Sequence, residues 1–560
     1  MIEVLIKNVR IVDGTGNPWY WGHVGIKDGK ISGIWRGQSG RIEADETIDG
    51  SGCCLMPGVV DVHGHSDFTV KDNPGLSNLL RQGITTQAVG QCGFSMYAFG
   101  DAYVPRVRER TNTEDEIGWR TLREWRDMIQ KQGLGLNLAP LVGHNTLRCS
   151  AMKEQGDVRV DPTDEEMQIM KELLHKGMQQ GAFGLTTGLR YPHGRTSHTD
   201  EVIDLCRMVK PYGGVHISHM RSEEEYMLPS VAELIDTAEQ SGVPSCATHH
   251  KAVFFPNWGA PAESLRLLEE ARDRGVEVFC DIYPWMYARE VNLGSWFQGH
   301  MLGDDSDAGK SADDLLAVLS DDDEWKVMKQ QLIEQHQKLK LENEKRQEKL
   351  FSRGVYVPDL WDPAFFDCVV YSPSHPELVD MNFSQVANEL DLTDHWEAMR
   401  QVYLADKGKT LVAAGPISEA DVRRILQHPL SMVSTDSVGL EDDPDLQDPQ
   451  SGAHPRGWGT YPRVLGHYVR DEAVLDLEDA VRKMTALPAH FLGLQDRGQI
   501  QVGFHADLVL FDPETVASGA DFADPCQPPL GIRAVFVNGE KVVSEGEVSD
   551  NLAGKVLRRN

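Results

Sequence analysis

Long apolar runs are absent from this sequence of 560 residues. No stretch approaches the roughly 18 apolar residues that a membrane-spanning helix needs, so we expect no membrane partner. The first residues, MIEVLIKNVRIVDG, lack the apolar segment and small-residue cleavage site of a secretory signal. Cysteine is also scarce, with nine residues, and an odd number does not suit a complete disulfide framework. Together these absences predict a reducing, cytoplasmic location.

Basic residues are few relative to acidic ones. Lys and Arg number 55 against 86 Asp and Glu, which gives a formal net charge of -31. This balance argues against a basic nucleic-acid footprint, so we expect no nucleic-acid partner. It also tends to repel an anionic substrate unless the site itself carries local positive charge. A halophilic source is an open alternative explanation of the acidic excess.

Both ends of the chain are rich in strand patterns. Near the N-terminus, VLIKNVRIVDG and HVGIKDGKISGIW alternate apolar residues with Gly-Asp turns. Near the C-terminus, AVFVNGEKVV places an Asn-Gly pair between two apolar segments, which is a strong hairpin signal. We therefore predict one small β-sandwich domain built from residues 1–56 and 491–560.

The middle of the chain alternates strand and helix patterns. Short apolar strands such as VHISH and VEVFCDIY are separated by helical stretches, one of which starts with a Thr163/Glu166 capping box and another of which ends at Gly242. Repeated β-α units with short loops are typical of a parallel sheet. The predicted fold class is thus α/β, with a (β/α)8 TIM-like barrel over residues 57–490. A charged helical insertion is expected at about 303–355, as a surface helix or, alternatively, as a lid or oligomer contact.

Metal-binding side chains recur where these strands end. In a (β/α)8 barrel the chemistry lies at the C-terminal ends of the strands. Imidazole, thiolate and carboxylate together favour a divalent metal, with zinc preferred. Taken singly, each has a plain alternative, such as surface histidines or a packed free cysteine. The predicted metal-binding residues are His63, His65, Cys92, His219, Asp436 and one of the adjacent His249 and His250.

The sequence resembles the amidohydrolase superfamily and, within it, the N-acyl-D-amino-acid deacylases (D-aminoacylases). The motifs that carry this resemblance run in family order from about residue 5 to 540. They are MPGVVDVHGHSDF, GITTQAVGQCGFS, LVGHNTLR, GAFGLTTGLRYPHG, HISHMRSE, THHK, STDS, HPRGWGTYPRVLGHY and the stretch from AVRKMTALPAHFLGL to HADLVLFDP.

The resemblance implies a role for each metal-binding residue. Cys92, His219 and His249 would hold one tightly bound zinc ion, with His249 preferred to His250 because the family pattern is His-x-Lys. A second, weaker position would use His63, His65 and Asp436. Asp436 would also take a proton from the attacking water and return it to the leaving amine; the alternatives are a metal ligand only, or a helix cap. Asp67 would orient a ligand or cap a helix.

The resemblance also implies residues for substrate binding. Arg456 would grip the α-carboxylate of the substrate, with help from Lys251 and Tyr191, although Lys251 could be a surface residue and Tyr191 a packed aromatic. Arg221 and Arg463 are interpreted as structural ion-pair residues. The chain departs from the family pattern where the amino-acid side chain would bind, with Trp285, Tyr287, Arg289 and Glu290 in one segment and Asn382-Phe383 in another. Arg289 is the next candidate for the carboxylate.

The predicted function is zinc-dependent removal of the acyl group from a small-molecule N-acyl-D-amino acid. One alternative is a related enzyme acting on another amide, a lactam or an ester. A different alternative is a metal-binding homologue without activity, against which the complete set of ligand positions argues. The sequence does not indicate an oligomeric state.

Overall fold

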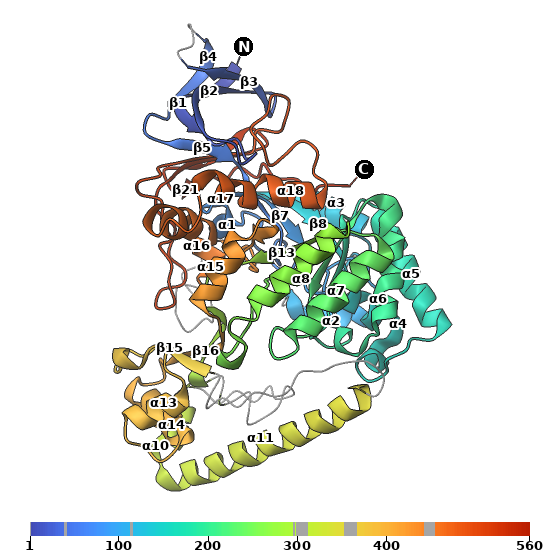
Figure 1. The fold of residues 1–560 in the computed structure, drawn as a ribbon, viewed down its shortest axis with the longest axis vertical. Coiled ribbons are helices and arrows are strands. Elements are labelled where there is room, and N and C mark those ends of the chain that lie inside the picture. The colour runs from blue at the N-terminus through green and yellow to red at the C-terminus, as the bar shows by residue number, and fades with distance from the viewer. Residues whose placement is uncertain are drawn as a thin grey trace.

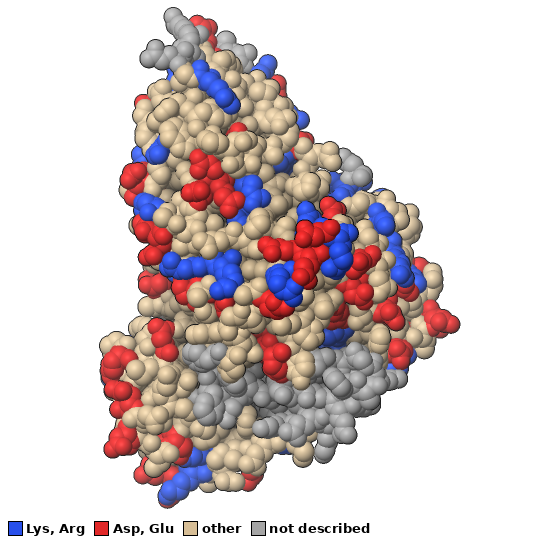
Figure 2. All heavy atoms as spheres, in the orientation of Figure 1, with Lys and Arg blue, Asp and Glu red and all other residues tan. Residues whose placement is uncertain are grey.

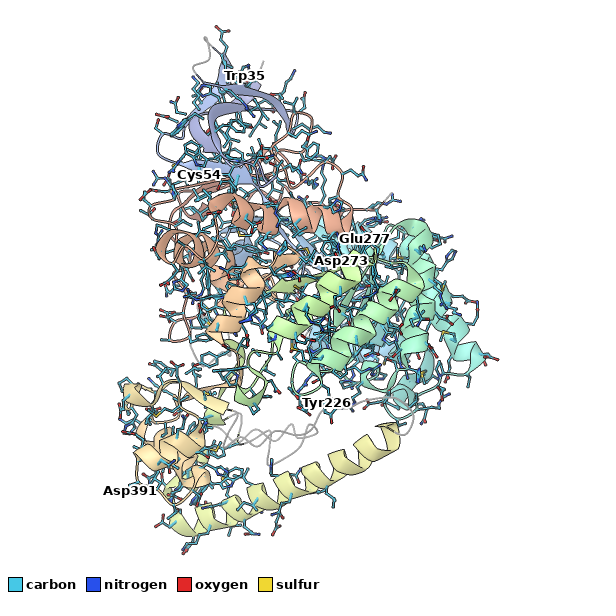
Figure 3. All side chains as sticks on the ribbon, viewed as in Figure 1. Trp35, Cys54, Tyr226, Asp273, Glu277 and Asp391 are labelled. Carbon is cyan, nitrogen blue, oxygen red and sulfur yellow. The ribbon has the colours of Figure 1, made fainter. Side chains whose placement is uncertain are left out.

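The computed structural model describes residues 2–37, 42–111, 116–294, 297, 312–351, 367–441 and 454–559. Figure 1 shows three parts along the longest axis: a β-rich part at one end, a barrel with helices in the middle, and a smaller part with a long helix at the other end. In Figure 3, Trp35 marks the first of these parts and Asp391 the last. Within the described residues, no helix is both long enough and apolar enough to cross a membrane.

The predicted (β/α)8 barrel is confirmed. Its strands pair in parallel in two runs, which meet at the continuous segment formed by β8 and β9. A parallel bridge between Gly64 and Ser437 closes the ring, because it joins the end of the first strand to the end of the last. The strands are β6 (Val59–Asp61), β7 (Ile84–Val89), β8 (Asn137–Pro140) with β9 (Val142–Gly143), β10 (Gly184–Gly188), β11 (Val215–His219), β12 (Ser245–Ala247), β13 (Val278–Ile282) and β17 (Ser431–Val433).

Amphipathic helices surround the barrel and bury their apolar faces against it. The predicted capping box of α5 is present, since the Thr163 side chain accepts from the Glu166 amide, and α7 ends at Gly242 in the left-handed conformation. The longer helices outside the insertion are α3 (Leu122–Gln132), α4 (His144–Met152), α5 (Asp164–Gln179), α6 (Thr199–Val209), α7 (Met227–Ser241), α8 (Pro261–Asp273), α15 (Glu419–Gln427), α16 (Arg456–Arg463) and α17 (Leu477–Met484). Shorter ones are α1 (Ser77–Leu80), α2 (Val104–Arg110) and α18 (Ala486–Leu492).

An apolar cluster fills the barrel interior. It takes residues from or beside every strand, from Val60 to Met432, and Phe491 of α18 packs on Phe279 with ring centroids 5.2 Å apart. This core holds the strands in place, so that their C-terminal ends present side chains from fixed positions.

The two ends of the chain share one nine-stranded sheet, as expected for a β domain built from both termini. The sheet curls, since Ile31 of its edge strand β3 exchanges backbone hydrogen bonds with Gly503 and Phe504, just before β18. Asn538 and Gly539, both with positive φ, form the predicted hairpin turn. The strands are β1 (Ile2–Ile11), β2 (Tyr20–Lys27), β3 (Lys30–Arg36), β4 (Ala44–Asp49), β5 (Cys54–Pro57), β18 (Leu508–Phe511), β19 (Ile532–Val537), β20 (Glu540–Ser544) and β21 (Glu547–Val548).

The last residues leave this sheet and return to the barrel. Leu138 of β8 donates its amide to the Lys555 carbonyl at 2.9 Å, and Arg559 donates to the Gly181 carbonyl. The segment after β21 therefore packs on the barrel instead of continuing the β domain, which the prediction for 491–560 did not anticipate.

The excursion between β13 and α15 is longer than the insertion expected at 303–355. It has its own antiparallel sheet, in the order β14-β16-β15, and its own apolar cluster around Phe297, Trp325 and Tyr403. The expected charged helix is the 30-residue α11, whose first turns pack in this cluster and whose remainder extends away from it (Figure 1). The elements are β14 (Tyr287–Asn292), α10 (Ala312–Ser320), α11 (Asp322–Phe351), β15 (Asp367–Tyr371), α13 (Phe383–Glu389), α14 (His395–Ala405) and β16 (Leu411–Pro416).

Candidate metal centre

A pocket of about 780 Å³ opens at the C-terminal ends of the barrel strands. Its lining includes the predicted residues His65, Cys92, Tyr191, His219, His249, Lys251, Asp436 and Arg456. His63 lies directly behind this wall, fully buried and in contact with Cys92. The structure therefore brings nine of the ten predicted site residues together. The tenth, Arg289, belongs to β14, but its side chain lies outside the described part of the chain.

The chain reaches this pocket through unusual backbone conformations. Cys92, His249 and Asp436 follow their strands by two or three residues and have φ of 53°, 35° and 49°, in the left-handed region that non-glycine residues rarely adopt. Backbone strain of this kind is concentrated at functional sites, where the surrounding structure holds it in place. Main-chain hydrogen bonds do so here, since the Asp436 amide donates to the His63 carbonyl at 2.9 Å.

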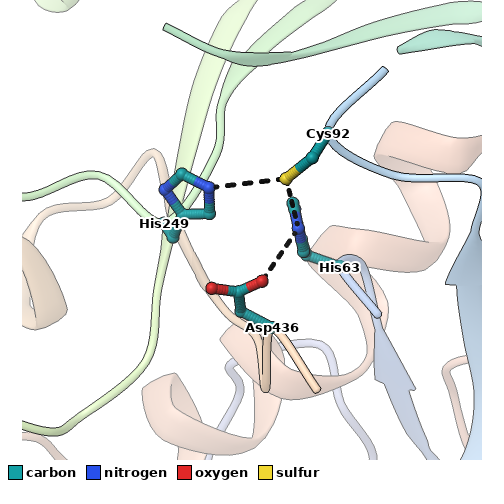
Figure 4. Close-up of side chains that lie close together, drawn as sticks. All are labelled: His63, Cys92, His249 and Asp436. Atoms are coloured by element: carbon teal, nitrogen blue, oxygen red, sulfur yellow. Dashed lines mark hydrogen bonds and ion pairs between the residues drawn. The ribbon is translucent and has the colours of Figure 1, made fainter. Parts of the chain in front are cut away.

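The Cys92 sulfur lies at the centre of three imidazole rings. Sγ is 3.4 Å from His63 Nε2, 3.6 Å from His219 Nδ1 and 3.7 Å from His249 Nε2. Figure 4 shows dashed contacts from both His63 and His249 to this sulfur. His250 points elsewhere and pairs with Ser264 at 2.8 Å, so that of the two adjacent histidines only His249 faces Cys92.

This environment favours the thiolate. Burial alone raises the pKa of a thiol, but His63 and the other two rings outweigh it and hold the pKa of Cys92 well below its ordinary value. By contrast, burial raises the pKa of Cys206, a thiol inside α6 with no such neighbours. A thiolate, and not a thiol, is the form that binds a metal.

Asp436 contacts His63 and His65, the other two residues of the predicted weaker metal position. Its Oδ1 lies 3.3 Å from His63 Nε2 and 3.2 Å from His65 Nε2, and its Oδ2 lies 3.0 Å from Arg456 Nη1. Burial would raise the pKa of this carboxyl, but Arg456 and the two histidines hold it well below its ordinary value. Asp436 is therefore an ionised carboxylate inside the pocket.

Glu223 is a site residue that the sequence analysis did not identify. Its Oε1 accepts from His249 Nδ1 at 2.6 Å and from Lys251 Nζ at 2.6 Å. A carboxylate on Nδ1 fixes the ring so that Nε2 faces Cys92, which is how proteins orient metal-binding histidines. The sequence pattern gives little indication of this role, since Glu223 is one of three consecutive glutamates after HISHMRS.

These donors fit a soft divalent metal. Two clusters of buried ligand atoms share His249: one with His63, Cys92 and Asp436, the other with His219 and Glu223. His219 Nε2 is buried and has no hydrogen-bond partner among the described residues, and Nδ1 faces the Cys92 sulfur. Within the described residues, no hydrogen bond from outside the cluster therefore fixes this ring. A thiolate, imidazoles and a carboxylate in one buried place are the ligand types that zinc prefers.

The remaining residues named in the sequence analysis have different surroundings, which decide between their alternative interpretations. Lys251 is buried, so its alternative interpretation as a surface residue is wrong. The Tyr191 ring packs on His219, with centroids 4.5 Å apart. Asp67 accepts from the Met96 amide at 3.2 Å and caps no described helix. Arg221 is an ion-pair residue, as expected, since it pairs with Glu233 at 2.8 Å.

Three expectations about the neighbouring segments need correction. Trp285 and Tyr287 were expected to reshape the pocket, but among the described residues Tyr283 and Ala288 line it instead. Trp285 turns away and donates to Thr460 at 3.2 Å. Arg463 forms no ion pair with the described residues; it donates to the Pro284 carbonyl and stacks over Trp285.

Asn382 and Phe383 also lie away from the pocket. Asn382 caps α13, and Phe383 is buried in the core of the insertion. In the acidic segment after Asp436, residues 442–453 lie outside the described residues.

Known proteins resemble this chain over its whole length. A sequence profile described as the amidohydrolase family matches residues 402–543. A D-aminoacylase of Alcaligenes xylosoxydans xylosoxydans is 30% identical over 561 residues, covering 100% of this chain and 98% of the relative. The chain belongs to the D-aminoacylase family. An N-acyl-D-glutamate deacylase of the same organism is 30% identical, covering 100% of this chain and 97% of the relative.

A solved structure agrees with this family membership. The N-acyl-D-glutamate deacylase of Bordetella bronchiseptica, complexed with zinc and a phosphonate inhibitor that mimics the tetrahedral intermediate, has a TM-score of 0.71. It is 29% identical, with 100% of this chain and 99% of that chain covered. The resemblance predicted from the sequence motifs is thereby confirmed at the level of the family.

Proposed function

We propose that this D-aminoacylase-family protein is a zinc-dependent amide hydrolase that converts N-acyl-D-amino acids into a carboxylate and a free D-amino acid. The observation that carries the proposal is the buried cluster of Cys92 with three histidines and Asp436 at the floor of the pocket. Relatives named for this activity, and a related structure that contains zinc, support it.

Cys92, His219 and His249 would hold the tightly bound zinc ion, and His63, His65 and Asp436 would form a weaker second position. When bound, zinc polarises a carbonyl and lowers the pKa of a nearby water. The convergence of three rings on the Cys92 sulfur supports the first set, and the contact of Asp436 with both His63 and His65 supports the second.

Asp436 would serve as the general base. Its carboxylate is ionised because Arg456 and the two histidines stabilise the charge, so it can accept a proton from the attacking water. The same oxygen would then return the proton to the nitrogen of the leaving amino acid. A carboxylate that projects into the pocket from the end of β17 is suitably placed for both transfers.

The α-carboxylate of the substrate would bind to Arg456, Lys251 and Tyr191. Arg456 uses Nη1 for both Asp436 and the Ala288 carbonyl, and no described residue pairs with Nε or Nη2. Those two nitrogens lie side by side on the guanidinium and can bind a carboxylate at two points. We also place the protein in a reducing, cytoplasmic compartment, because all nine cysteines are buried and none of them forms a disulfide.

A panel of N-acetyl-D- and N-acetyl-L-amino acids, assayed with added zinc, tests this function. We expect release of free amino acid from D-substrates, with the L-substrates at least tenfold slower, and loss of the reaction after removal of zinc by a chelator. Asp436→Asn protein serves as the inactive control for contaminating hydrolases. Equal rates on D- and L-substrates, or no release from any of them, would contradict the proposal.

A further inference from the structure

The charged side chains that line the pocket are almost fully paired. Four of the five lysine and arginine residues in its described wall face a carboxylate of the same wall at 2.6–3.0 Å. The pairs are Arg106 with Glu109, Arg190 with Glu224, Lys251 with Glu223, and Arg456 with Asp436. The fifth is Arg110, which forms no ion pair within 4 Å among the described residues. Its charge does act on the buried Asp67, whose pKa burial raises to about 6.

Arg110 is held by aromatic rings instead. Its guanidinium carbon lies 4.6 Å from the centroid of Phe68 and 4.3 Å from that of Phe94, as in a cation–π clamp. Stacking of this kind fixes the plane of the guanidinium but uses none of its five N–H donors. An unpaired, oriented cation in the wall of a pocket is a binding group for an anion.

The clamp is connected directly to the metal centre. Phe68 stacks on His65 with centroids 5.4 Å apart, and Phe94 packs on Tyr191 at 5.8 Å. Tyr191 in turn packs on His219. Arg110 is therefore separated by the Phe94 ring from Tyr191, one of the residues proposed for the α-carboxylate.

We propose that Arg110 determines substrate specificity by binding a second carboxylate, carried by the side chain of the amino acid. This inference rests on the proposed deacylase function and narrows it to the N-acyl derivatives of acidic D-amino acids. The charge balance supports it, because a protein of net charge -31 would otherwise repel a dianion, and Arg110 is a wall cation that no wall carboxylate already pairs.

Matched substrates and a matched variant test the proposal. N-acetyl-D-glutamate and N-acetyl-D-glutamine differ in charge but hardly in shape, and Arg110→Met keeps an apolar chain between the two phenylalanines. We expect wild-type kcat/KM to be at least tenfold higher for the glutamate derivative, since hydrogen bonds to charged groups contribute about 10–100-fold. In Arg110→Met this advantage should disappear, with kcat/KM for the glutamine derivative within about threefold of wild type.

Arg108→Met provides the control. Arg108, like Arg110, is an exposed residue of α2, but it does not line the pocket, and its loss changes the net charge equally. We expect it to leave the preference for glutamate unchanged. An equal loss of preference in both variants, or a parallel fall on both substrates in Arg110→Met, would overturn the proposal. A dependence of N-succinyl-D-alanine hydrolysis on Arg110 would also overturn it, because the second carboxylate would then belong to the acyl group.

Calorimetric binding separates this inference from the proposed function. If no N-acyl-D-amino acid is hydrolysed, the proposed deacylase function is wrong. The proposal for Arg110 is then tested by ligand binding alone. The Arg110 proposal then requires that N-acetyl-D-glutamate bind wild-type protein at least tenfold more tightly than N-acetyl-D-glutamine does. It also requires that the Arg110→Met protein bind both ligands equally weakly. Equal affinity of the two ligands for the wild-type protein would overturn it.

Discussion

The thiol of Cys92 contacts three histidine nitrogens, so its removal should affect metal binding more than any other single change at the site. In Cys92→Ala we expect the tightly held zinc to be lost after dialysis and turnover to be abolished. The measurement is zinc content per chain by elemental analysis. In His63→Ala, whose ring belongs to the proposed weaker position, most of the tight zinc should remain.

Cys206→Ala is the matched control for this experiment, because it removes an equally buried thiol that lies within α6 and contacts no metal-binding residue. It should keep wild-type zinc content. Full zinc occupancy in Cys92→Ala would show that the ligand assignment is wrong, and equal zinc loss in Cys92→Ala and His63→Ala would show that the two positions are not distinct.

Asp436 is predicted to move protons, which an amide cannot do. Asp436→Asn preserves size and should retain the fold and the tightly bound zinc, but we expect turnover to fall by about 10²–10⁴-fold, the contribution typical of a general base. Steady-state kinetics with zinc analysis of the same preparation give the test. A variant that keeps more than about a tenth of the wild-type rate would contradict this role.

Arg456 is predicted to hold the α-carboxylate of the substrate. Loss of one partner of a buried charge pair costs about 2–5 kcal/mol, so Arg456→Ala should lower kcat/KM by roughly 30–5,000-fold. Arg456→Lys should recover only part of this loss. Because Arg456 also contacts Asp436, the α-methyl ester of the same substrate is needed as a comparison. An equal loss on acid and ester would show that Arg456 acts through Asp436 and not on the substrate carboxylate.

At the scale of residues, the sequence could identify side chains whose chemistry is distinctive and whose position follows a strand. Cys92 and Asp436 were found in this way. Glu223 was not, because a carboxylate four residues beyond a histidine is common, and only the fold shows that it reaches His249 Nδ1. Arg110 was missed for a similar reason, since nothing in VPRVRER indicates which arginine faces the pocket.

At the scale of elements, local signals predicted local structure. The Thr163/Glu166 capping box, the glycine after α7 and the Asn538-Gly539 turn all depend on contacts within a few residues. The sheet of the insertion depends on a pairing between Tyr287 and Pro416, far apart in the chain. Periodicity cannot show such long-range pairing, so the sequence analysis found only the helical middle of this part.

The start of α5 offers a test of the local signal. The Thr163 side chain accepts from the Glu166 amide, and Glu166 in turn accepts from the Thr163 amide at 2.7 Å. Thr163→Ala should cost about 1 kcal/mol of local stability, whereas Thr163→Ser should cost little. Hydrogen exchange followed by mass spectrometry should show amides in the first turn of α5 exchanging about fivefold faster in the alanine variant. Unchanged exchange in that turn would mean that packing, and not the cap, determines where α5 begins.

At the scale of the whole molecule, the protein and its proposed substrates carry charge of the same sign. The chain carries a net charge of -31, and the proposed substrates are anions. Figure 2 shows carboxylates spread over the visible face, many of them beside Lys or Arg. On α8, for example, Arg266 pairs with Glu263 and Glu270. The long-range field is therefore repulsive, whereas Arg456, the cation proposed to bind the α-carboxylate, lies in the pocket wall, where salt screens it less.

This repulsion between protein and substrate predicts that added salt raises kcat/KM for an anionic substrate. The Debye length falls from about 30 Å at 0.01 M to about 10 Å at 0.1 M, so added NaCl should screen the distant carboxylates before it weakens the contacts of Arg456 inside the pocket. We expect kcat/KM for an N-acetyl-D-amino acid to rise by about tenfold over this range, and kcat/KM for its uncharged methyl ester to change little. Zinc and pH are kept constant. A fall in kcat/KM for the acid would contradict the prediction, because it would mean that the pocket cations already dominate the field that an approaching anion meets.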